Sequence, residues 1–161
     1  MRTERVDAFR NYRQGMSVID VDGLTVRDST FRATHGVPPQ AGVDLEPDLP
    51  TQRLSRINFT NCSFLNNTGA GFQVVPGNLD STSAPLTISF SGHTVAGNLY
   101  GVAIIDARPA VHGSFAAGSH IIVEGVSIDG SVQEGVVRNH SSPRLLALIP
   151  PNALLVVGRA S

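Results

Sequence analysis

Two interleaved patterns repeat along this chain about every 30 residues, and this period restricts the possible folds more than any other feature. The first pattern is a glycine followed by alternating apolar residues, as in Gly42-Val-Asp-Leu-Glu-Pro. Its glycines are 27, 29, 30 and 34 residues apart. They are Gly15, Gly42, Gly71, Gly101 and Gly135.

The second pattern begins with an apolar pair at positions i and i+2, passes through a small or polar residue, and closes on Ser or Thr plus an apolar residue. An example is Ile57-Asn-Phe59-Thr-Asn61-Cys-Ser-Phe64. The closing residues are 33, 31 and 33 positions apart. They are Phe31, Phe64, Val95 and Ile128. Two independent patterns therefore keep one period.

The alternation within each copy has a period of two, which indicates strands with one buried face. Short strands that recur every 30 residues or so, without helix-length segments between them, are typical of a solenoid in which each coil covers the next. The copies run in one direction, so neighbouring coils should pair in parallel, and the crossover rule favours right-handed winding. The sequence predicts an all-β, right-handed parallel β-helix of about five coils.

The stretch Phe59-Thr-Asn-Cys-Ser-Phe64-Leu-Asn-Asn-Thr-Gly-Ala-Gly71-Phe resembles the repeat unit of the right-handed parallel β-helix superfamily, the pectate-lyase-like fold. The similarity covers residues 9 to 140. It implies triangular coils, three sheets, an interior stack that contains the four closing residues, polysaccharide chemistry, and an extracellular or cell-surface location. The catalytic signatures of pectate lyases and polygalacturonases do not carry over residue by residue.

We expect a single domain over residues 1–161. Residues 1–14 should form a partial coil or an N-terminal cap, residues 15–140 the repeated coils, and residues 141–161 a C-terminal strand pair or cap. The N-terminal segment Phe9 to Gly15 matches the spacing of Phe64 to Gly71 to within one residue. Either upstream coils are missing or the charged segment closes the end. The apolar C-terminal segment suggests self-association through the coil ends.

Composition excludes several classes of protein. The net charge is −1, and the twelve cations are arginines without a basic stripe, so we do not expect nucleic acid as a partner. Residues 1–14 contain no signal-peptide core, and no apolar run is long enough to span a membrane. The single Cys62 excludes an internal disulfide framework.

The copy at Gly42 is the one that carries paired carboxylates. Alternation places Val43 and Leu45 inward and Asp44 and Glu46 outward, with α-carbons about 6.5 to 7 Å apart. Such a pair suits a general acid and base, and mutual repulsion should raise one pKa. The competing interpretation is two solvated charges on an exposed face.

An insertion immediately precedes this copy. Gly42 lies eleven positions after Phe31, whereas in the other copies the glycine lies six or seven positions after the closing residue. Insertions in a solenoid tend to gather on the binding face. His35 lies in this insertion and is a third catalytic candidate.

Register across the coils should stack further polar residues beside the pair. One predicted outward column contains Ser17, Asp44, Gln73, Ala103 and Val137. We assign substrate binding to Ser17 and Gln73, to Asp20 and Asp106 at strand ends, and to Arg53 and Arg108 as nominal arginine candidates. No cofactor is expected, although the oxygen-rich group would suit Ca²⁺ better than zinc.

These residues favour a protein that binds a polar or uronate-containing polysaccharide or other glycan. In one alternative the protein also cleaves this polysaccharide, by a lyase or hydrolase reaction. The competing hypothesis is a non-catalytic adhesin, surface or tailspike-like module. A third is a truncated fragment of a larger β-helix protein.

Overall fold

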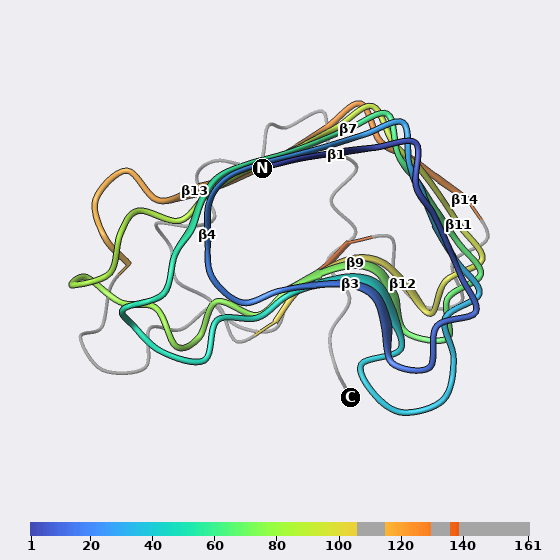
Figure 1. Ribbon diagram of the computed structural model, residues 1–161, viewed down its shortest axis with the longest axis horizontal. Coiled ribbons are helices and arrows are strands. Elements are labelled where there is room, and N and C mark those ends of the chain that lie inside the picture. The colour runs from blue at the N-terminus through green and yellow to red at the C-terminus, as the bar shows by residue number, and fades with distance from the viewer. Residues whose placement is uncertain (106–114, 130–135, 139–161) are drawn as a thin grey trace.

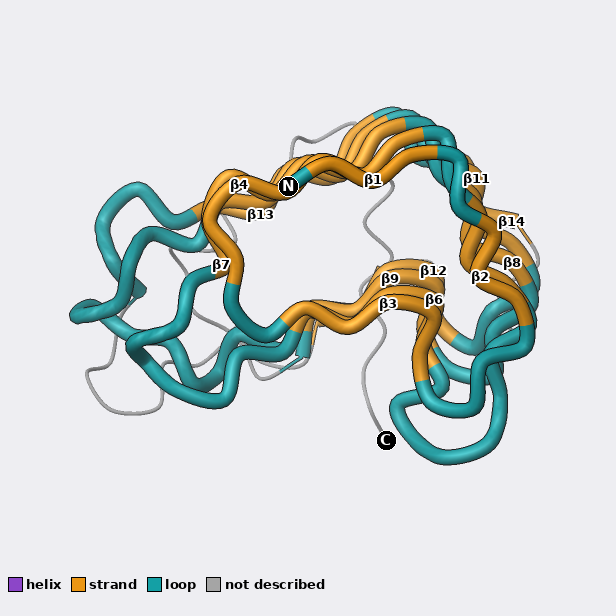
Figure 2. Tube along the Cα trace, viewed as in Figure 1, coloured by secondary structure: helices purple, strands orange, loops and turns teal. Residues whose placement is uncertain are grey.

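The computed structural model describes residues 1–105, 115–129 and 136–138, and within them the chain forms a parallel β-solenoid without helices. Figure 1 shows the coils stacked one behind another, with β1 at the front and β13 and β14 at the back. From this end the chain turns clockwise as it recedes, so the winding is right-handed (Figure 2). The predicted fold class is confirmed.

Each coil contributes one strand to each of three five-stranded parallel sheets. Sheet A contains β1 (Arg2–Glu4), β4 (Val21–Arg27), β7 (Leu54–Thr60), β10 (Thr87–Ser91) and β13 (His120–Glu124). Sheet B contains β2 (Asp7–Phe9), β5 (Thr30–Arg32), β8 (Ser63–Leu65), β11 (Thr94–Ala96) and β14 (Ser127–Asp129). Sheet C contains β3 (Gln14–Val18), β6 (Ala41–Leu45), β9 (Ala70–Val74), β12 (Tyr100–Ile104) and β15 (Val136–Arg138).

The solenoid has about three full turns, fewer than the five expected from the sequence. The three coils from β4 to β12 are described without a gap and have a neighbour on each side. In the first coil β1 is only three residues long, whereas β4 and β7 of the same sheet have seven. In the last coil, residues 130–135 lie outside the described part. The repeat pattern counts copies, whereas a full turn also needs three strands and their connections.

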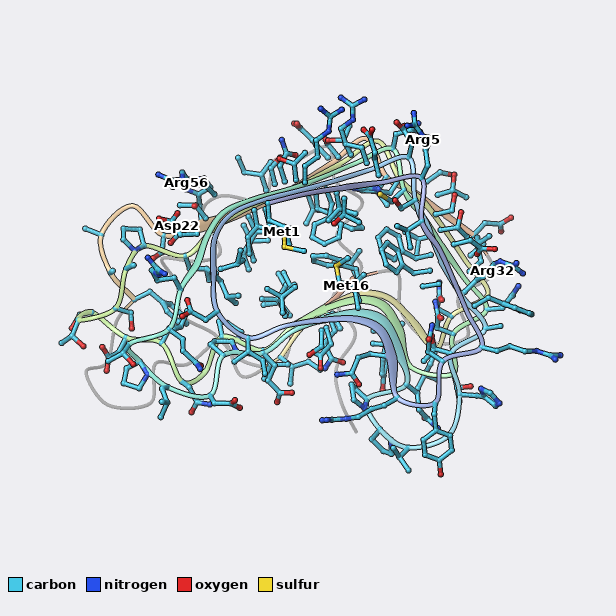
Figure 3. All side chains as sticks on the ribbon, viewed as in Figure 1. Met1, Arg5, Met16, Asp22, Arg32 and Arg56 are labelled. Atoms are coloured by element: carbon cyan, nitrogen blue, oxygen red, sulfur yellow. The ribbon has the colours of Figure 1, made fainter. Side chains whose placement is uncertain are left out.

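The interior is built from stacked apolar residues in register. Phe31, Phe64 and Val95 are fully buried and pair from coil to coil, as the repeat predicts, and the backbone of Ile128 continues the same register. The rings of Phe31 and Phe64 stack with centroids 5.5 Å apart. Figure 3 shows Met16 inside the coil and Arg5 and Arg32 pointing out. Each fully buried Phe contributes about 1.5–3 kcal/mol of burial energy, so this stack is a main source of stability.

The first coil differs from its expected alignment by one residue. Ala8, not Phe9, pairs with Phe31 and takes the inward position. Phe9 consequently points out and is 47% exposed. A slip of one residue moves a strand side chain to the opposite face, and the spacing argument allowed that error.

Residues with a left-handed backbone form two columns along the described coils, one at each of two corners. Between sheets A and B, the residue that follows the sheet A strand has a positive φ in all five coils. These residues are Arg5, Asp28, Asn61, Gly92 and Gly125. After sheet B, a second such column contains Arg10, Ala33, Asn66 and Gly97. The small or polar position of the repeat is therefore the corner where strand direction changes.

Buried asparagines bond the turn between sheets B and C. The Asn67 side chain donates from Nδ2 to the Phe31 carbonyl oxygen at 3.1 Å, and Asn98 donates likewise to Phe64 at 2.8 Å. Asn98 Oδ1 accepts from the backbone N and from Nδ2 of Asn67, at 3.0 and 2.8 Å. We call this arrangement the asparagine ladder. It satisfies buried backbone groups that no strand pairs.

Candidate functional site

Sheet C holds the carboxylate pair at β6. Its register is the one predicted: Ser17 pairs with Asp44, Asp44 with Gln73, Gln73 with Ala103, and Ala103 with Val137. Asp44 therefore lies on the outer face, in line with residues of the neighbouring coils. Gly42 allows this close stacking, because a Cβ there would lie 2.5 Å from the Gly71 carbonyl oxygen.

Asp44 is not a solvated charge, which corrects the expectation of an exposed column. The residue is only 1% exposed, and Gln73 is 8% exposed. The outer face around them is lined by small buried residues, Ala41, Ala70 and Ala103, against which Tyr100 and Ile105 pack. In Figure 2 the loops at either end of sheet C project beyond its outer face. Alternation predicts direction but not what covers an outer face.

The insertion before β6 forms one of these projecting loops, seen in cyan at the lower right of Figure 1. It packs on the next coil: the Gly69 backbone N donates to the Gln40 carbonyl oxygen at 2.9 Å. A Cβ on Gly69 would collide with the Pro39 carbonyl oxygen. The loop is thus attached to the next coil, beside β6.

Burial, and after it the negative charge of Glu46, raise the pKa of Asp44 to about 6. The Oδ1 atom accepts a hydrogen bond from Gln73 Nε2 at 3.1 Å, which favours the ionised form. The Oδ2 atom is buried without a partner. Contact with the Glu46 carboxylate favours the protonated form, because only a protonated Asp44 can donate to it.

Arg13 belongs to this environment, although the sequence argument missed it. Its positive charge lowers the pKa of Asp44, partly offsetting the effect of burial. The guanidinium Nε donates to the Pro38 carbonyl oxygen at 3.2 Å, which fixes Arg13 to the insertion. The relevant signal was present in the Phe9 to Gly15 spacing, which places Arg13 one coil before the insertion.

The remaining candidates do not all gather at the pair. His35 is exposed, and its backbone N donates to the Asn11 carbonyl oxygen at 3.0 Å. Its ring makes no hydrogen bond or ion pair with Asp44 or Glu46, all three being described residues. Ser17 is exposed beside Asp44 in register.

Asp20 and Arg53 contact each other instead. Arg53 donates its backbone N to Asp20 Oδ1 at 2.9 Å, and its Nε lies 3.4 Å from the same oxygen. Arg53 Nη1 also lies 3.9 Å from Asp22 Oδ2. Asp22 pairs in turn with Arg56, and Figure 3 labels Asp22 and Arg56. Asp106 and Arg108 lie outside the described residues.

The described residues contain no group of three or more His, Cys, Asp or Glu side chains that could hold a metal ion. Asp20 is turned toward Arg53, which leaves Asp44 and Glu46 as the carboxylates of the site. The proposal below uses these protein groups.

The described part of the chain has no helix long and apolar enough to cross a membrane. Fold and site together define a parallel β-solenoid with a partly shielded carboxyl pair on one outer face. The chain matches no protein-family profile, no curated protein and no solved structure. The solenoid class rests on the structure itself, and the pectate-lyase-like resemblance stays a prediction.

Proposed function

We propose that this chain is a carbohydrate-active β-helix protein that binds a polar, uronate-containing polysaccharide over sheet C and cleaves it with the Asp44–Glu46 pair. One observation carries the proposal: the pKa of Asp44 is raised to about 6 beside a second carboxylate. A proton held near neutral pH next to a proton acceptor is what general acid–base catalysis requires.

The two carboxyl groups have different access and hence different roles. Glu46 is half-buried and is the group that a ligand meets first, whereas Asp44 is 1% exposed. Glu46 acts as the catalytic residue, and Asp44 is a positioning residue that stores and returns the proton. Gln73 holds Asp44 Oδ1 and so leaves Oδ2 free for the exchange.

The proton balance closes for both reaction types. In hydrolysis the pair gives one proton to the leaving glycosidic oxygen as its bond to the anomeric carbon breaks, and recovers one from the water that adds there. In β-elimination it gives the same proton and recovers one from the carbon next to the uronate carboxylate. Neither reaction requires a further reactant besides water.

The test is turnover of uronate polymers and neutral glucans, followed through new reducing ends and unsaturated products. We expect Glu46→Gln to lower the rate at least about a hundredfold, the usual contribution of a general acid or base. Asp44→Asn should remove the limb of the rate profile near pH 6 that belongs to Asp44. Glu124→Gln, an exposed glutamate on sheet A, is the matched control and should be silent.

The burial of Asp44 favours a second candidate, a non-catalytic glycan-binding module of the adhesin or tailspike-like type. Binding of a polysaccharide without turnover, unchanged in Glu46→Gln, would support the module and reject the enzyme. Absence of both binding and turnover across the panel would reject the proposed function.

A further inference from the structure

The first coil leaves one edge of sheet A open. β1 is the terminal strand of this sheet and pairs with β4 on one side only. The Met1 carbonyl oxygen accepts from the Thr25 backbone N at 3.0 Å, and the Arg5 backbone N donates to the Arg27 carbonyl oxygen at 3.1 Å. Since alternate residues of a parallel strand bond to the same neighbour, the backbone of Thr3 also faces β4.

Arg2 and Glu4 therefore direct their backbone N–H and C=O groups toward the open edge. Their side chains lie on the outer face of the sheet, because Thr3 between them is in register with the buried Val26. Arg2 Nη2 lies 2.6 Å from Glu4 Oε2. The hydrogen bond from Arg2 lowers the pKa of Glu4, so both side chains are charged at neutral pH. The open edge thus carries one positive and one negative charge.

The apolar interior is also uncovered at this end. Met16 is in register with Val43, which is 0% exposed, but is itself only partly buried. Met1 is 81% exposed, and Figure 3 shows its side chain inside the outline of the coil. Of the large hydrophobic residues that are exposed in the described part of the chain, five of seven belong to residues 1–20. A covering layer would remove this apolar surface from water.

We propose that this end of the solenoid binds a second copy of the chain, with the two β1 strands antiparallel about a two-fold axis at Thr3. In this register Arg2 lies opposite Glu4 of the second copy, and Glu4 opposite the second copy's Arg2. The backbone groups of each such pair face each other and exchange two hydrogen bonds. The inference goes beyond the proposed function and does not depend on it.

The charges of β1 favour this register over the other ways in which two copies could pair. About Thr3, opposite charges face each other at both outer positions, which stabilises cross-strand pairs. A parallel pair in register, or an antiparallel pair centred on Arg2 or Glu4, sets like charges directly opposite each other, which is destabilising. A shift by one residue sets open backbone groups against groups already bonded to β4. Backbone and side chains therefore favour the same arrangement.

A two-fold contact closes both ends at once. The same surface of each copy is used, so assembly at this end stops at two copies. An open strand edge is otherwise a template for uncontrolled strand addition. The uncovered ends of the two interiors meet in the same contact, where the flexible thioether side chains of Met1 and Met16 suit an irregular apolar surface.

The experiment reverses single charges in the whole chain and measures dimerisation by analytical ultracentrifugation over a series of concentrations. Arg2→Glu and Glu4→Arg each set like charges opposite each other in a self-pair. Each variant alone should therefore dimerise at least about tenfold more weakly than the wild type. An equimolar mixture of the two should form dimers again, because one copy then carries only negative and the other only positive charges on β1.

Glu124→Arg is the matched control. Glu124 lies in the same outer column as Glu4, but on β13 at the opposite edge of sheet A. This variant should dimerise as the wild type does. Arg2→Glu keeps the test decisive if Glu4→Arg does not fold, since Arg2 is in register with the uncharged Thr25.

Amide hydrogen exchange then locates the contact. The backbone amides of Arg2 and Glu4 should be protected in the dimer and lose this protection on dilution, whereas the amide of Thr3, which faces β4, should not respond to dilution. A dimer in which Arg2 and Glu4 exchange freely, or whose strength neither charge reversal changes, would overturn the inference. A chain that stays monomeric up to about 1 mM, the weak limit of specific association, would also overturn it and leave the open edge to a different occupant.

Discussion

Thr34 interrupts the asparagine ladder. By position it follows Asn11 and precedes Asn67, and its backbone N donates to Asn67 Oδ1 at 3.1 Å. Its own hydroxyl is buried without a partner, and so is Nδ2 of Asn11. Thr34 stands where the ladder has an asparagine, and its shorter side chain leaves two buried polar groups unpaired.

We predict that Thr34→Asn stabilises the protein by about 1 kcal/mol. The new Oδ1 would accept from Asn11, as Asn98 accepts from Asn67, and the new Nδ2 would donate to the Ala8 carbonyl oxygen. Urea unfolding measures the gain. The reverse variant, Asn67→Thr, should lose stability by at least the same amount, and equal signs for the two variants would contradict this account.

At the scale of single residues, the sequence predicted which way the side chains of the site point but not what surrounds them. Alternation correctly placed Asp44 on the outer face with Gln73 beside it. It could not foresee the burial of Asp44, because alternation gives the direction of a side chain and not what packs against it. It also missed Arg13, whose effect on Asp44 operates between coils.

At the scale of strands and corners, backbone geometry accounts for the second repeat pattern. Every copy needs a left-handed residue between sheets A and B, and the chain supplies Arg, Asp, Asn or Gly there. Asn and Gly tolerate this conformation, whereas an ordinary L-residue loses about 1–2 kcal/mol. The repeat was recognisable from the sequence because this constraint recurs in each coil.

The two corners predict stability changes of opposite sign. Gly92 has φ of 69°, and a Cβ added there would meet nothing closer than 4.0 Å, so Gly92→Ala should cost about 1 kcal/mol through backbone strain alone. Ala33 has φ of 55°, and Ala33→Gly should stabilise by up to about 1 kcal/mol once the entropy of glycine is subtracted. Thermal unfolding of both variants measures the effect, and a loss in Ala33→Gly would contradict it.

At the scale of the whole molecule, two buried groups, His93 and Asp44, have opposite effects on how stability depends on pH. His93 is 2% exposed, and its Nδ1 accepts from the Cys62 backbone N at 2.9 Å. Its Nε2 must then carry the proton, which it donates to the Phe59 carbonyl oxygen at 3.2 Å. Burial lowers the pKa of this neutral ring to about 4. Asp44 has a pKa displaced in the other direction.

The signs follow from linkage. The unfolded state binds the His93 proton between its ordinary pKa of 6.5 and about 4, so that contribution to stability is lost as pH falls through this range. The folded state binds the Asp44 proton between the ordinary pKa of 3.8 and about 6, so that contribution is lost as pH rises through it. Each amounts to roughly 3 kcal/mol. In the wild type the two largely cancel.

Single variants should reveal the pH dependence of the free energy of unfolding that each group contributes. Asp44→Asn leaves His93 alone, and its free energy of unfolding should rise by roughly 3 kcal/mol from pH 4 to 6.5. His93→Gln leaves Asp44 alone, and its free energy of unfolding should fall by a similar amount over the same range. Urea midpoints at a series of pH values measure both. Parallel curves for the two variants would refute the compensation.

At this largest scale the fold class could be predicted from sequence, but the number of complete turns could not. Two patterns with one period fix parallel stacking, since each copy meets the next after one circuit. They do not show whether the first and last copies form whole coils. The candidate site was harder still to predict, because its properties depend on burial and charge at the few residues that depart from the repeat.

The position of Tyr12 gives the protein an optical reporter of its own. The chain has two tyrosines and no tryptophan, so its ultraviolet fluorescence comes from Tyr12 and Tyr100. Tyr12 rests on Gly36 of the insertion and is 68% exposed. A change around this ring alters the emission without any attached label, and Tyr12→Phe subtracts that signal. The fluorescence of the chain itself therefore reports on the insertion beside β6.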